Sequence, residues 1–203
     1  YWVHVGAHNL SEEGTEGTGE AYVIEESILY DWNGYTYGPW TAGGWDYGLI
    51  KLESPVSSDM MASDNVDIIS LLANSDGYDG EYAGTTILLD GQLATVAGWG
   101  HTEVGGESSD ALMETELSIM CCNPSCDWPG GLWHITCDPI GCNTIWLCAE
   151  DEEAESGTCF GDSGSPLFIE EDGEYKLIGI NSWGSGACTP EDQHYPNIYA
   201  RIY

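Results

Sequence analysis

The sequence predicts an all-β protein. Short segments rich in aromatic and β-branched residues recur along the 203 residues, and turn-forming residues separate them. The 27 glycines suit a chain that reverses direction often, and no segment is convincing as an amphipathic helix. Hydrophobic residues make up 42% of the chain, which is enough for a packed core. Many short strands with turn signals favour a β-barrel or a sandwich.

The first part of the chain predicts three strands separated by polar or glycine-rich loops. They are expected over Tyr1–Gly6, Ala21–Tyr30 and Tyr47–Leu52, and a loop then leads to the apolar run Ile68–Leu72. The segment Asn74–Tyr82 has few apolar residues and carries Asp, Gly and Ser, so it is the best candidate for a linker.

The rest of the chain predicts further strands and hairpins. Asp90-Gly91 and Asp172-Gly173 are typical hairpin turns between apolar runs. The expected strands are Thr85–Leu89, Leu93–Trp99, Leu167–Glu170, Tyr175–Trp183 and Tyr199–Tyr203. Between them, Cys121–Cys148 holds six cysteines with several Gly and Pro and predicts an insertion stapled by disulfides.

The charge of the chain is strongly negative. Thirty-five acidic residues stand against three basic ones, giving a formal net charge of −32. Such a surface repels nucleic acids and anionic membranes, so we expect neither as a partner. We favour the interpretation that this is the ordinary acidic surface of a secreted protein. Adaptation to salt and resistance to proteases that cut after Lys or Arg are the alternatives. No stretch is long and apolar enough to span a membrane.

The eight cysteines lie between positions 121 and 188, and no Cys-x-x-Cys pair of the kind that binds zinc occurs among them. An even number without such spacing predicts disulfides and an oxidising compartment, hence secretion. Asn9-Leu10-Ser11 is a glycosylation sequon, which is a weak signal by itself.

The run Cys159–Leu167 predicts a serine nucleophile on a tight glycine turn. Attack on a carbonyl needs an exposed hydroxyl, and the resulting oxyanion needs nearby backbone N–H groups. Gly161 precedes Ser163 by two residues and has no side chain that could block its N–H.

This Gly-Asp-Ser-Gly turn resembles that of chymotrypsin/trypsin-like serine proteases. Five other segments resemble the family in the same order, so the likeness covers essentially the whole chain: Val5–Leu10, Trp45–Leu52, Val96–Gly100, Asn181–Gly186 and Pro196–Ile202. The resemblance implies two six-stranded antiparallel Greek-key barrels. Residues 1–73 would hold an incomplete first barrel, and residues 74–203 the linker and the second barrel.

The resemblance also implies roles for individual residues. Ser163 would be the nucleophile, Asp46 the carboxylate that orients a histidine, and the N–H groups of Gly161 and Ser163 the oxyanion hole. An uncharged, chymotrypsin-like pocket and an edge for the substrate backbone would be formed by Gly157, Thr158, Phe160, Ser182, Trp183, Gly184 and Asn197. Asp162 would form a buried ion pair with an N-terminal amine after activation.

The chain departs from the family pattern in one decisive way. It has no segment like Ala-Ala-His-Cys, and none of its histidines occupies the expected place: these are His4, His8, His101, His134 and His194. Only about half of the first barrel is represented. We therefore expect a companion segment of about 50 residues that carries the histidine and three strands.

The resemblance implies a disulfide between Cys159 and Cys188, and a second from Cys148 to Cys137 or Cys126. It also places Asn9, Glu13 and Glu16 in a loop that binds calcium in many relatives. A solvated acidic loop is the other interpretation and the favoured one, and we expect no other metal or cofactor.

These observations predict a secreted serine endopeptidase that acts on proteins or peptides through an acyl-enzyme. The alternative from a different class is a non-catalytic protease homologue that serves as a binding module. The absent histidine motivates this alternative, whereas the intact Ser163 and Asp46 argue against it.

Overall fold

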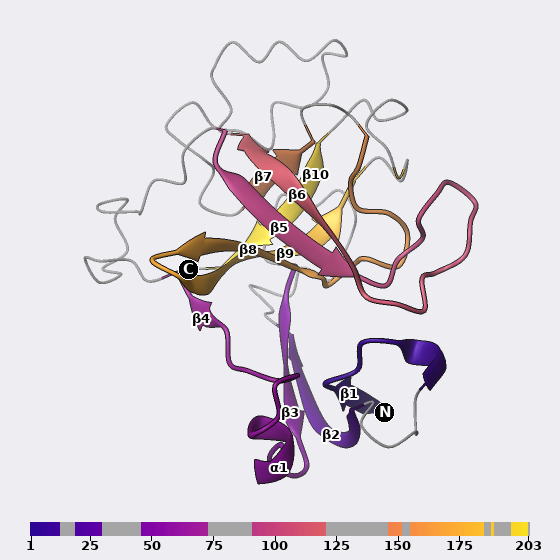
Figure 1. The fold of residues 1–203 in the computed structure, drawn as a ribbon, viewed down its shortest axis with the longest axis vertical. Coiled ribbons are helices and arrows are strands. Elements are labelled where there is room, and N and C mark those ends of the chain that lie inside the picture. Colours follow the sequence, from indigo (N-terminus) through magenta and orange to yellow (C-terminus); the bar gives the residue numbers. More distant parts are fainter. Residues whose placement is uncertain are drawn as a thin grey trace.

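A computed structural model describes residues 1–12, 19–29, 46–72, 91–120, 146–151, 155–184, 188 and 196–202. Strands dominate these residues, and the helical elements among them are the short turns η1 (Leu10–Glu12) and α1 (Ser58–Met61). The fold class is therefore all-β, as predicted. Figure 1 shows a small sheet below and a larger, barrel-like sheet above.

The smaller sheet has three antiparallel strands in the order β1-β2-β3. They are β1 (Trp2–Val5), β2 (Glu20–Leu29) and β3 (Gly48–Leu52). A register shift between Ile24 and Glu26 bends β2 against β3. Among the described residues, the outer edges of β1 and β3 pair with no further strand.

This small sheet leaves much of its apolar surface in solvent. Trp2 is 70% exposed, Leu29 77% and Leu49 67%, whereas Tyr22 is buried. The Tyr22 hydroxyl contacts the Glu20 carboxylate and accepts the Ser57 N–H at 2.8 Å, which ties the sheet to the N-terminus of α1. A sheet whose faces and edges are both open to water is unusual for a stable domain.

The larger sheet closes into a barrel. Among the described residues, six antiparallel strands follow the order β10-β7-β6-β5-β8-β9, and β9 pairs with β10. They are β5 (Leu93–Gly98), β6 (Met113–Met120), β7 (Trp146–Glu150), β8 (Pro166–Glu171), β9 (Glu174–Trp183) and β10 (Asn197–Arg201). The short strand β4 (Ser70–Leu71) pairs with β9 in the parallel direction. Closure removes the free edges that the smaller sheet keeps.

The core lies inside this barrel. Alternate residues of β5 are buried, as expected for a strand with one face inward. Leu117, Leu147, Leu167 and Ile178 are fully buried, and the Tyr199 ring joins them. The barrel is therefore the rigid part on which the chemistry-bearing turns are mounted.

Most predicted strands are confirmed, with shifted ends. Within the apolar run Ile68–Leu72, Ser70–Leu71 forms a strand, and the last strand begins at Asn197. Strand β6 was not predicted, and the first half of β7 falls inside the segment predicted as a cysteine-rich insertion. Thr85–Leu89 and the linker Asn74–Tyr82 lie outside the described residues, and the domain boundary at residue 73 stays a prediction.

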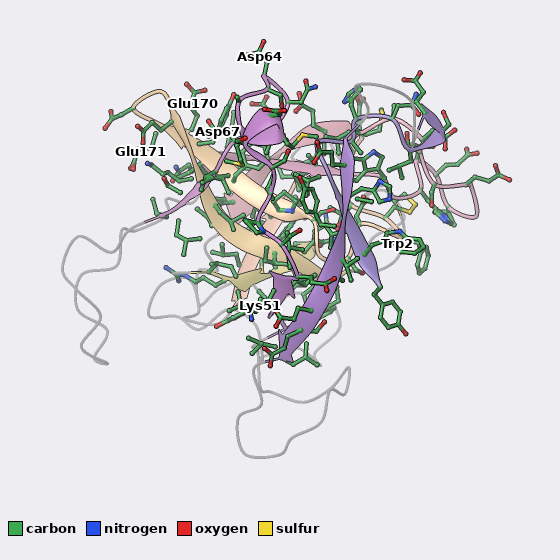
Figure 2. The ribbon with its side chains drawn as sticks, turned by 90° about the horizontal axis from the view of Figure 1, so that it is seen from below. Trp2, Lys51, Asp64, Asp67, Glu170 and Glu171 are labelled. Carbon is green, nitrogen blue, oxygen red and sulfur yellow. A yellow bond between two sulfur atoms is a disulfide. The ribbon has the colours of Figure 1, made fainter. Side chains whose placement is uncertain are left out.

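The acidic surface is visible in Figure 2, where Asp64, Asp67, Glu170 and Glu171 project from the periphery. Two of the three basic side chains pair locally. Lys51 lies 2.7 Å from Glu25, and Lys176 lies 2.5 Å from Glu174 and lowers the pKa of that carboxyl. Arg201 is buried in the barrel, and burial lowers its pKa to about 10.

Leu167 tests the assignment of the core. Leu167→Ala should lower the free energy of unfolding by about 2–5 kcal/mol, because it leaves a cavity in the barrel. Leu93→Ala, at a 59% exposed position of β5, should cost less than about 1 kcal/mol. Urea unfolding followed by far-UV circular dichroism measures both, and equal losses would contradict the barrel as the core.

Candidate active site

Ser163 lies on a tight turn between Cys159 and the start of β8. Gly161 and Gly164 have φ of +95° and +88°, a conformation that glycine adopts without strain. The N–H of Asp162 donates to the Cys159 carbonyl at 3.2 Å, and the N–H of Ser165 donates to the Asp162 carbonyl at 3.0 Å. The turn presents Ser163 in solvent, as a nucleophile requires.

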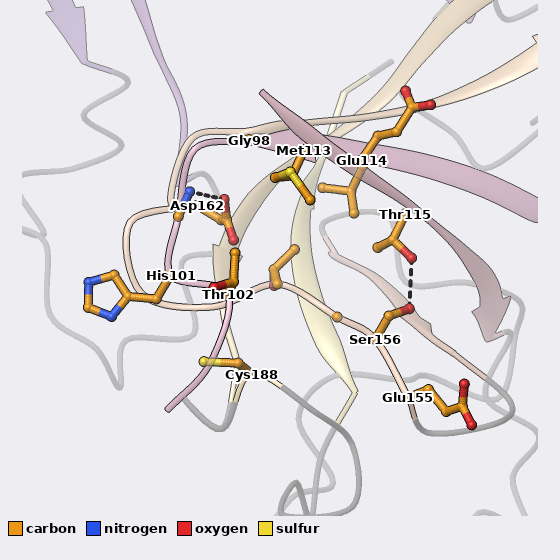
Figure 3. Close-up of a pocket in the computed structure, with 14 residues that line it drawn as sticks. Gly98, His101, Thr102, Met113, Glu114, Thr115, Glu155, Ser156, Asp162 and Cys188 are labelled. Carbon is orange, nitrogen blue, oxygen red and sulfur yellow. Dashed lines mark hydrogen bonds between the residues drawn. The ribbon is translucent and has the colours of Figure 1, made fainter. Parts of the chain in front are cut away.

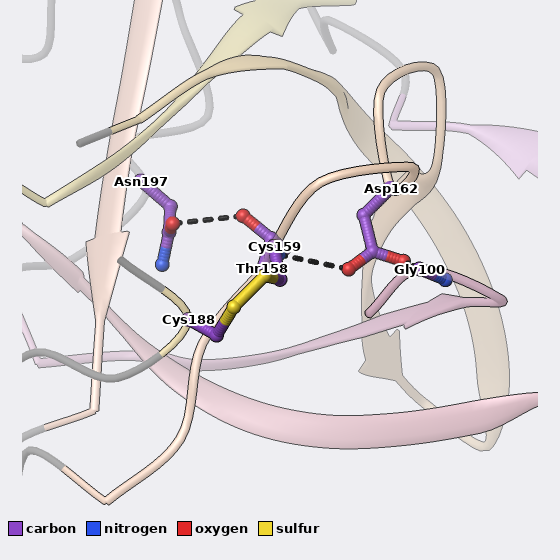
Figure 4. Close-up of a disulfide and its surroundings, with 6 residues drawn as sticks. All are labelled: Gly100, Thr158, Cys159, Asp162, Cys188 and Asn197. Atoms are coloured by element: carbon purple, nitrogen blue, oxygen red, sulfur yellow. Dashed lines mark hydrogen bonds between the residues drawn. A yellow bond between two sulfur atoms is a disulfide. The ribbon is translucent and has the colours of Figure 1, made fainter. Parts of the chain in front are cut away.

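The Asp162 carboxylate points back under this turn and holds it. It accepts the Gly100 N–H at 2.8 Å and the Cys159 N–H at 2.9 Å (Figure 4). A Cβ at Gly98 would lie 2.2 Å from this carboxylate, and one at Gly100 would lie 2.4 Å from it. Gly98 and Gly100 are therefore required for space, a role that was not predicted from the sequence.

The two predicted oxyanion donors are unpaired. Neither the Gly161 N–H nor the Ser163 N–H donates a hydrogen bond among the described residues. The Phe160 carbonyl accepts the His101 N–H at 2.8 Å. Because C=O and N–H point in opposite directions across a trans peptide, this bond directs the Gly161 N–H away from His101. The backbone thus offers two free donors beside Ser163.

Asp46 is linked to the serine turn through β9. The Ser182 hydroxyl donates to the Asp46 carboxylate at 2.6 Å. The neighbouring Asn181 exchanges backbone hydrogen bonds of 2.8 Å with Gly164 and Ser165. The chain of contacts from Asp46 to Ser163 therefore runs through one strand of the rigid barrel, although the two residues are 117 positions apart in the sequence.

A histidine is not part of this chain of contacts in the described residues. His4, His8 and His101 form no hydrogen bond with Asp46 or Ser163. His134 and His194 lie outside the described residues. The His101 ring instead meets the Phe160 ring edge-on, with centroids 6.1 Å apart, and Phe160 is largely exposed.

A cavity of about 200 Å³ lies beside Asp162 (Figure 3). Glu114 and Glu155 also line it, but their exposed side chains extend away from Asp162. The Nδ1 atom of His101 is buried and has no hydrogen-bond partner among the described residues, and its ring points away from Asp162.

The predicted pocket residues meet at the start of β10. The Thr158 hydroxyl donates to the Asn197 Oδ1 at 2.7 Å, and a Cβ at Gly184 would lie 3.1 Å from the same oxygen. The disulfide between Cys159 and Cys188 braces this region, as the resemblance implied (Figure 4).

Two further predictions concern cysteine and calcium. Cys148 is buried on β7, but its proposed partners Cys126 and Cys137 lie outside the described residues.

The Oδ1 atom of Asn9, a predicted calcium ligand, accepts hydrogen bonds from both the N–H and the hydroxyl of Ser11, at 3.0 and 2.7 Å. Glu13 and Glu16 also lie outside the described residues, so calcium binding stays a prediction.

A closed antiparallel barrel with an exposed serine on a glycine turn, and a carboxylate tied to it, defines a serine-protease scaffold. The trypsin family profile matches residues 1–203. The chain belongs to the chymotrypsin/trypsin-like serine protease family.

Curated relatives agree with this assignment. The chain is 30% identical to a trypsin of Saccharopolyspora erythraea, over 79% of this chain and 56% of the relative. It is 29% identical to human transmembrane protease serine 5, over 78% of this chain and 30% of the relative. It therefore spans less than two thirds of these relatives. No helix in the described ranges has the length and apolarity needed to cross a membrane.

Gly100 tests the packing under Asp162. Gly100→Ala should lower the free energy of unfolding by about 3 kcal/mol, because its methyl group would overlap the Asp162 carboxylate. Gly105→Ala is the control. Gly105 has φ of +72° and open space around it, so only backbone strain of about 1 kcal/mol is expected. Equal losses in urea unfolding would argue against the tight packing.

Proposed function

We propose that this chain carries the nucleophile, the oxyanion donors and the orienting carboxylate of a serine endopeptidase. The observation that supports this most strongly is the connection from Asp46 through Ser182 to the Ser163 turn. Asp46 is half-buried and bonds a half-buried serine 136 residues away, whereas an aspartate with no role would ordinarily be solvated. The substrates would be proteins or peptides, held as an added strand against Ser182–Gly184.

The reaction would proceed through an acyl-enzyme. The Ser163 oxygen bonds to the carbonyl carbon while a histidine takes its proton, and the carbonyl oxygen becomes an oxyanion held by the N–H groups of Gly161 and Ser163. The C–N bond then breaks, and the leaving amine receives that proton. Water attacks the ester by the same route, releases the acid and restores the Ser163 hydroxyl. Asp46 stabilises the imidazolium in both halves.

The histidine would come from a companion segment that covers the small sheet. The open edges of β1 and β3 offer backbone groups for added strands, and the exposed Leu29, Leu49 and Ile50 offer apolar surface. A second copy of the chain is a poor occupant, because each copy carries a net charge of −32. A companion with more basic residues would complement this surface.

The same companion would supply a cation for Asp162. Its α-amine would enter the cavity beside Asp162 and pair with that carboxylate, which already accepts two backbone N–H groups. A half-buried carboxylate gains from such a partner, because an unpaired charge that is partly withdrawn from water is costly. The turn that carries Ser163 would then be held from both sides.

Secretion and an uncharged pocket complete the proposal. The Cys159–Cys188 disulfide suits an oxidising compartment. No acidic side chain occurs among the predicted pocket residues Gly157, Thr158, Gly184 and Asn197, which favours an uncharged, chymotrypsin-like preference.

The second candidate function is a non-catalytic binding module of the same family. It is favoured by one observation: among the described residues, no histidine hydrogen-bonds to Asp46 or Ser163. Ser163 without a base is a weak nucleophile, so such a protein would bind peptides without cleaving them.

Labelling separates the two functions. Native material treated with a serine-directed phosphonate should carry the label on Ser163, and mass spectrometry under reducing conditions should reveal a companion peptide with a histidine. Ser163→Ala is the matched control and should take no label. A folded chain of 203 residues alone that takes no label would refute the endopeptidase and favour the binding module.

Gly161 tests the oxyanion hole. Gly161→Ala should lower kcat by about 10²–10³-fold, because the φ of +95° disfavours a side chain and the Gly161 N–H would turn away from the oxyanion. Gly173→Ala is the control, since Gly173 has a similar φ of +82° in the β8–β9 hairpin, outside the site. Loss of kcat in both variants alike would point to general destabilisation.

A further inference from the structure

The sequon Asn9-Leu10-Ser11 is a motif that the proposed chemistry leaves unused. Asparagine, any residue except proline, and then serine or threonine is the acceptor pattern for N-linked sugars in secreted proteins. No other asparagine of the 203 residues fits it, because the similar Asn123-Pro124-Ser125 carries the excluded proline. Three residues match such a pattern easily by chance, so the structure has to show whether Asn9 can hold a sugar.

The Asn9 side chain is oriented by the serine of its own sequon. Oδ1 accepts the Ser11 N–H at 3.0 Å and the Ser11 hydroxyl at 2.7 Å. A backbone N–H can donate only to the oxygen of the amide, so this bond identifies Oδ1, and the two bonds occupy both of its acceptor positions. Because the amide is planar, they also fix Nδ2, which is the atom that bears an N-linked sugar.

The Nδ2 atom of Asn9 is free to be modified. It forms no hydrogen bond with the rest of the described chain. The buried, unpaired side-chain nitrogen and oxygen atoms of the described residues belong to His101, Asn197 and Tyr199. Since Asn9 Nδ2 is unpaired and is not one of these buried atoms, it is open to solvent. A sugar on it would displace no hydrogen-bond partner.

The sequon lies at the surface, but its backbone is held by the loop that leads into β6. Asn9 forms an antiparallel bridge with Ala111, and the Leu10 N–H donates to the Asp110 carbonyl at 2.7 Å. Asn9 is half-buried, and Ser11 is exposed. A sugar on Asn9 would therefore begin at a defined position of the folded protein.

A polar cavity of about 290 Å³ lies beside Asn9. His8, Glu12 and Asn65 line it, and all three are exposed residues. Their ring nitrogens, carboxylate and amide can exchange hydrogen bonds with the hydroxyl groups of a sugar. The folded protein thus offers both space and hydrogen-bonding groups next to Nδ2.

We propose that Asn9 carries an N-linked oligosaccharide. The donor would be a lipid-linked oligosaccharide pyrophosphate of the secretory pathway. Asn9 Nδ2 bonds to the anomeric carbon of the first sugar, and the bond from that carbon to the pyrophosphate oxygen breaks. The pyrophosphate leaves with the bonding electrons, and Nδ2 releases one proton, so the amide is kept. This inference rests on the proposed secretion and not on the proposed catalysis.

Mass spectrometry of the native protein tests the proposal directly. Peptide N-glycosidase treatment in water labelled with heavy oxygen should lower the mass of the intact chain by that of an oligosaccharide. It should also convert residue 9 to an aspartate that carries the heavy oxygen. A glutamate-specific protease then yields the peptide that ends at Glu12, in which the change can be located. A native peptide with only unmodified Asn9 would overturn the inference.

Variants of the full chain, secreted from eukaryotic cells, assign the sugar to one side chain. Asn9→Gln and Ser11→Ala should each abolish it, whereas Ser11→Thr should keep it because threonine also satisfies the sequon. Asn65→Gln, in the same cavity but outside any sequon, is the control and should keep it. An N-linked sugar that persists in Asn9→Gln would overturn the inference. The native measurement remains decisive if a variant is not secreted.

Two further readouts separate this inference from the proposed function. Ser163→Ala should carry the same sugar as the unchanged chain, although it takes no phosphonate label. A native chain with labelled Ser163, an intact Cys159–Cys188 disulfide and bare Asn9 would overturn this inference alone. Bare Asn9 together with free thiols at Cys159 and Cys188 would overturn it and the proposed secretion as well. A sugar on Asn9 without a label on Ser163 would support the inference and count against the endopeptidase.

Discussion

The hydrogen bonds of the Asp162 carboxylate organise the whole candidate site. One oxygen holds Gly100 and the other holds Cys159, so a single side chain joins the turn after β5 to the turn before β8. The first turn carries His101, whose N–H orients the Phe160 peptide and hence the Gly161 donor. The second carries Ser163 itself. Breaking these bonds would loosen the contact between the two turns, which would then be joined by the hydrogen bond from the His101 N–H to the Phe160 carbonyl.

Sequence alone predicted much of this arrangement, for identifiable reasons. The Ser163 turn and the strand after Asp46 can be recognised from short stretches of sequence. The glycines and aspartates in these stretches have few other structural roles. Strand β6 was missed although Met113–Met120 alternates between the two faces, with Leu117 and Ile119 on one and Glu114 and Glu116 on the other. Burial inside a closed barrel depends on the partners of a strand, and these are set by contacts distant in the sequence.

The details of the pocket were less accessible to prediction for a similar reason. Asn197 was predicted as a pocket residue, but its hydrogen bond with Thr158, 39 positions away, depends on contacts that the sequence does not reveal. Tyr199 reads as an ordinary aromatic of a buried strand. The steric demand of Asp162 on Gly98 and Gly100 likewise needed coordinates.

The open three-stranded sheet has a consequence for behaviour in solution. Its free edges and exposed apolar side chains would ordinarily favour pairing between copies, yet every copy carries the same large negative charge. Colloidal stability then rests on repulsion, which acts over about 10 Å at 0.1 M salt and only about 3 Å at 1 M. Ionic strength, which hardly affects a fully covered barrel, would thus govern whether uncovered chains remain dispersed or associate.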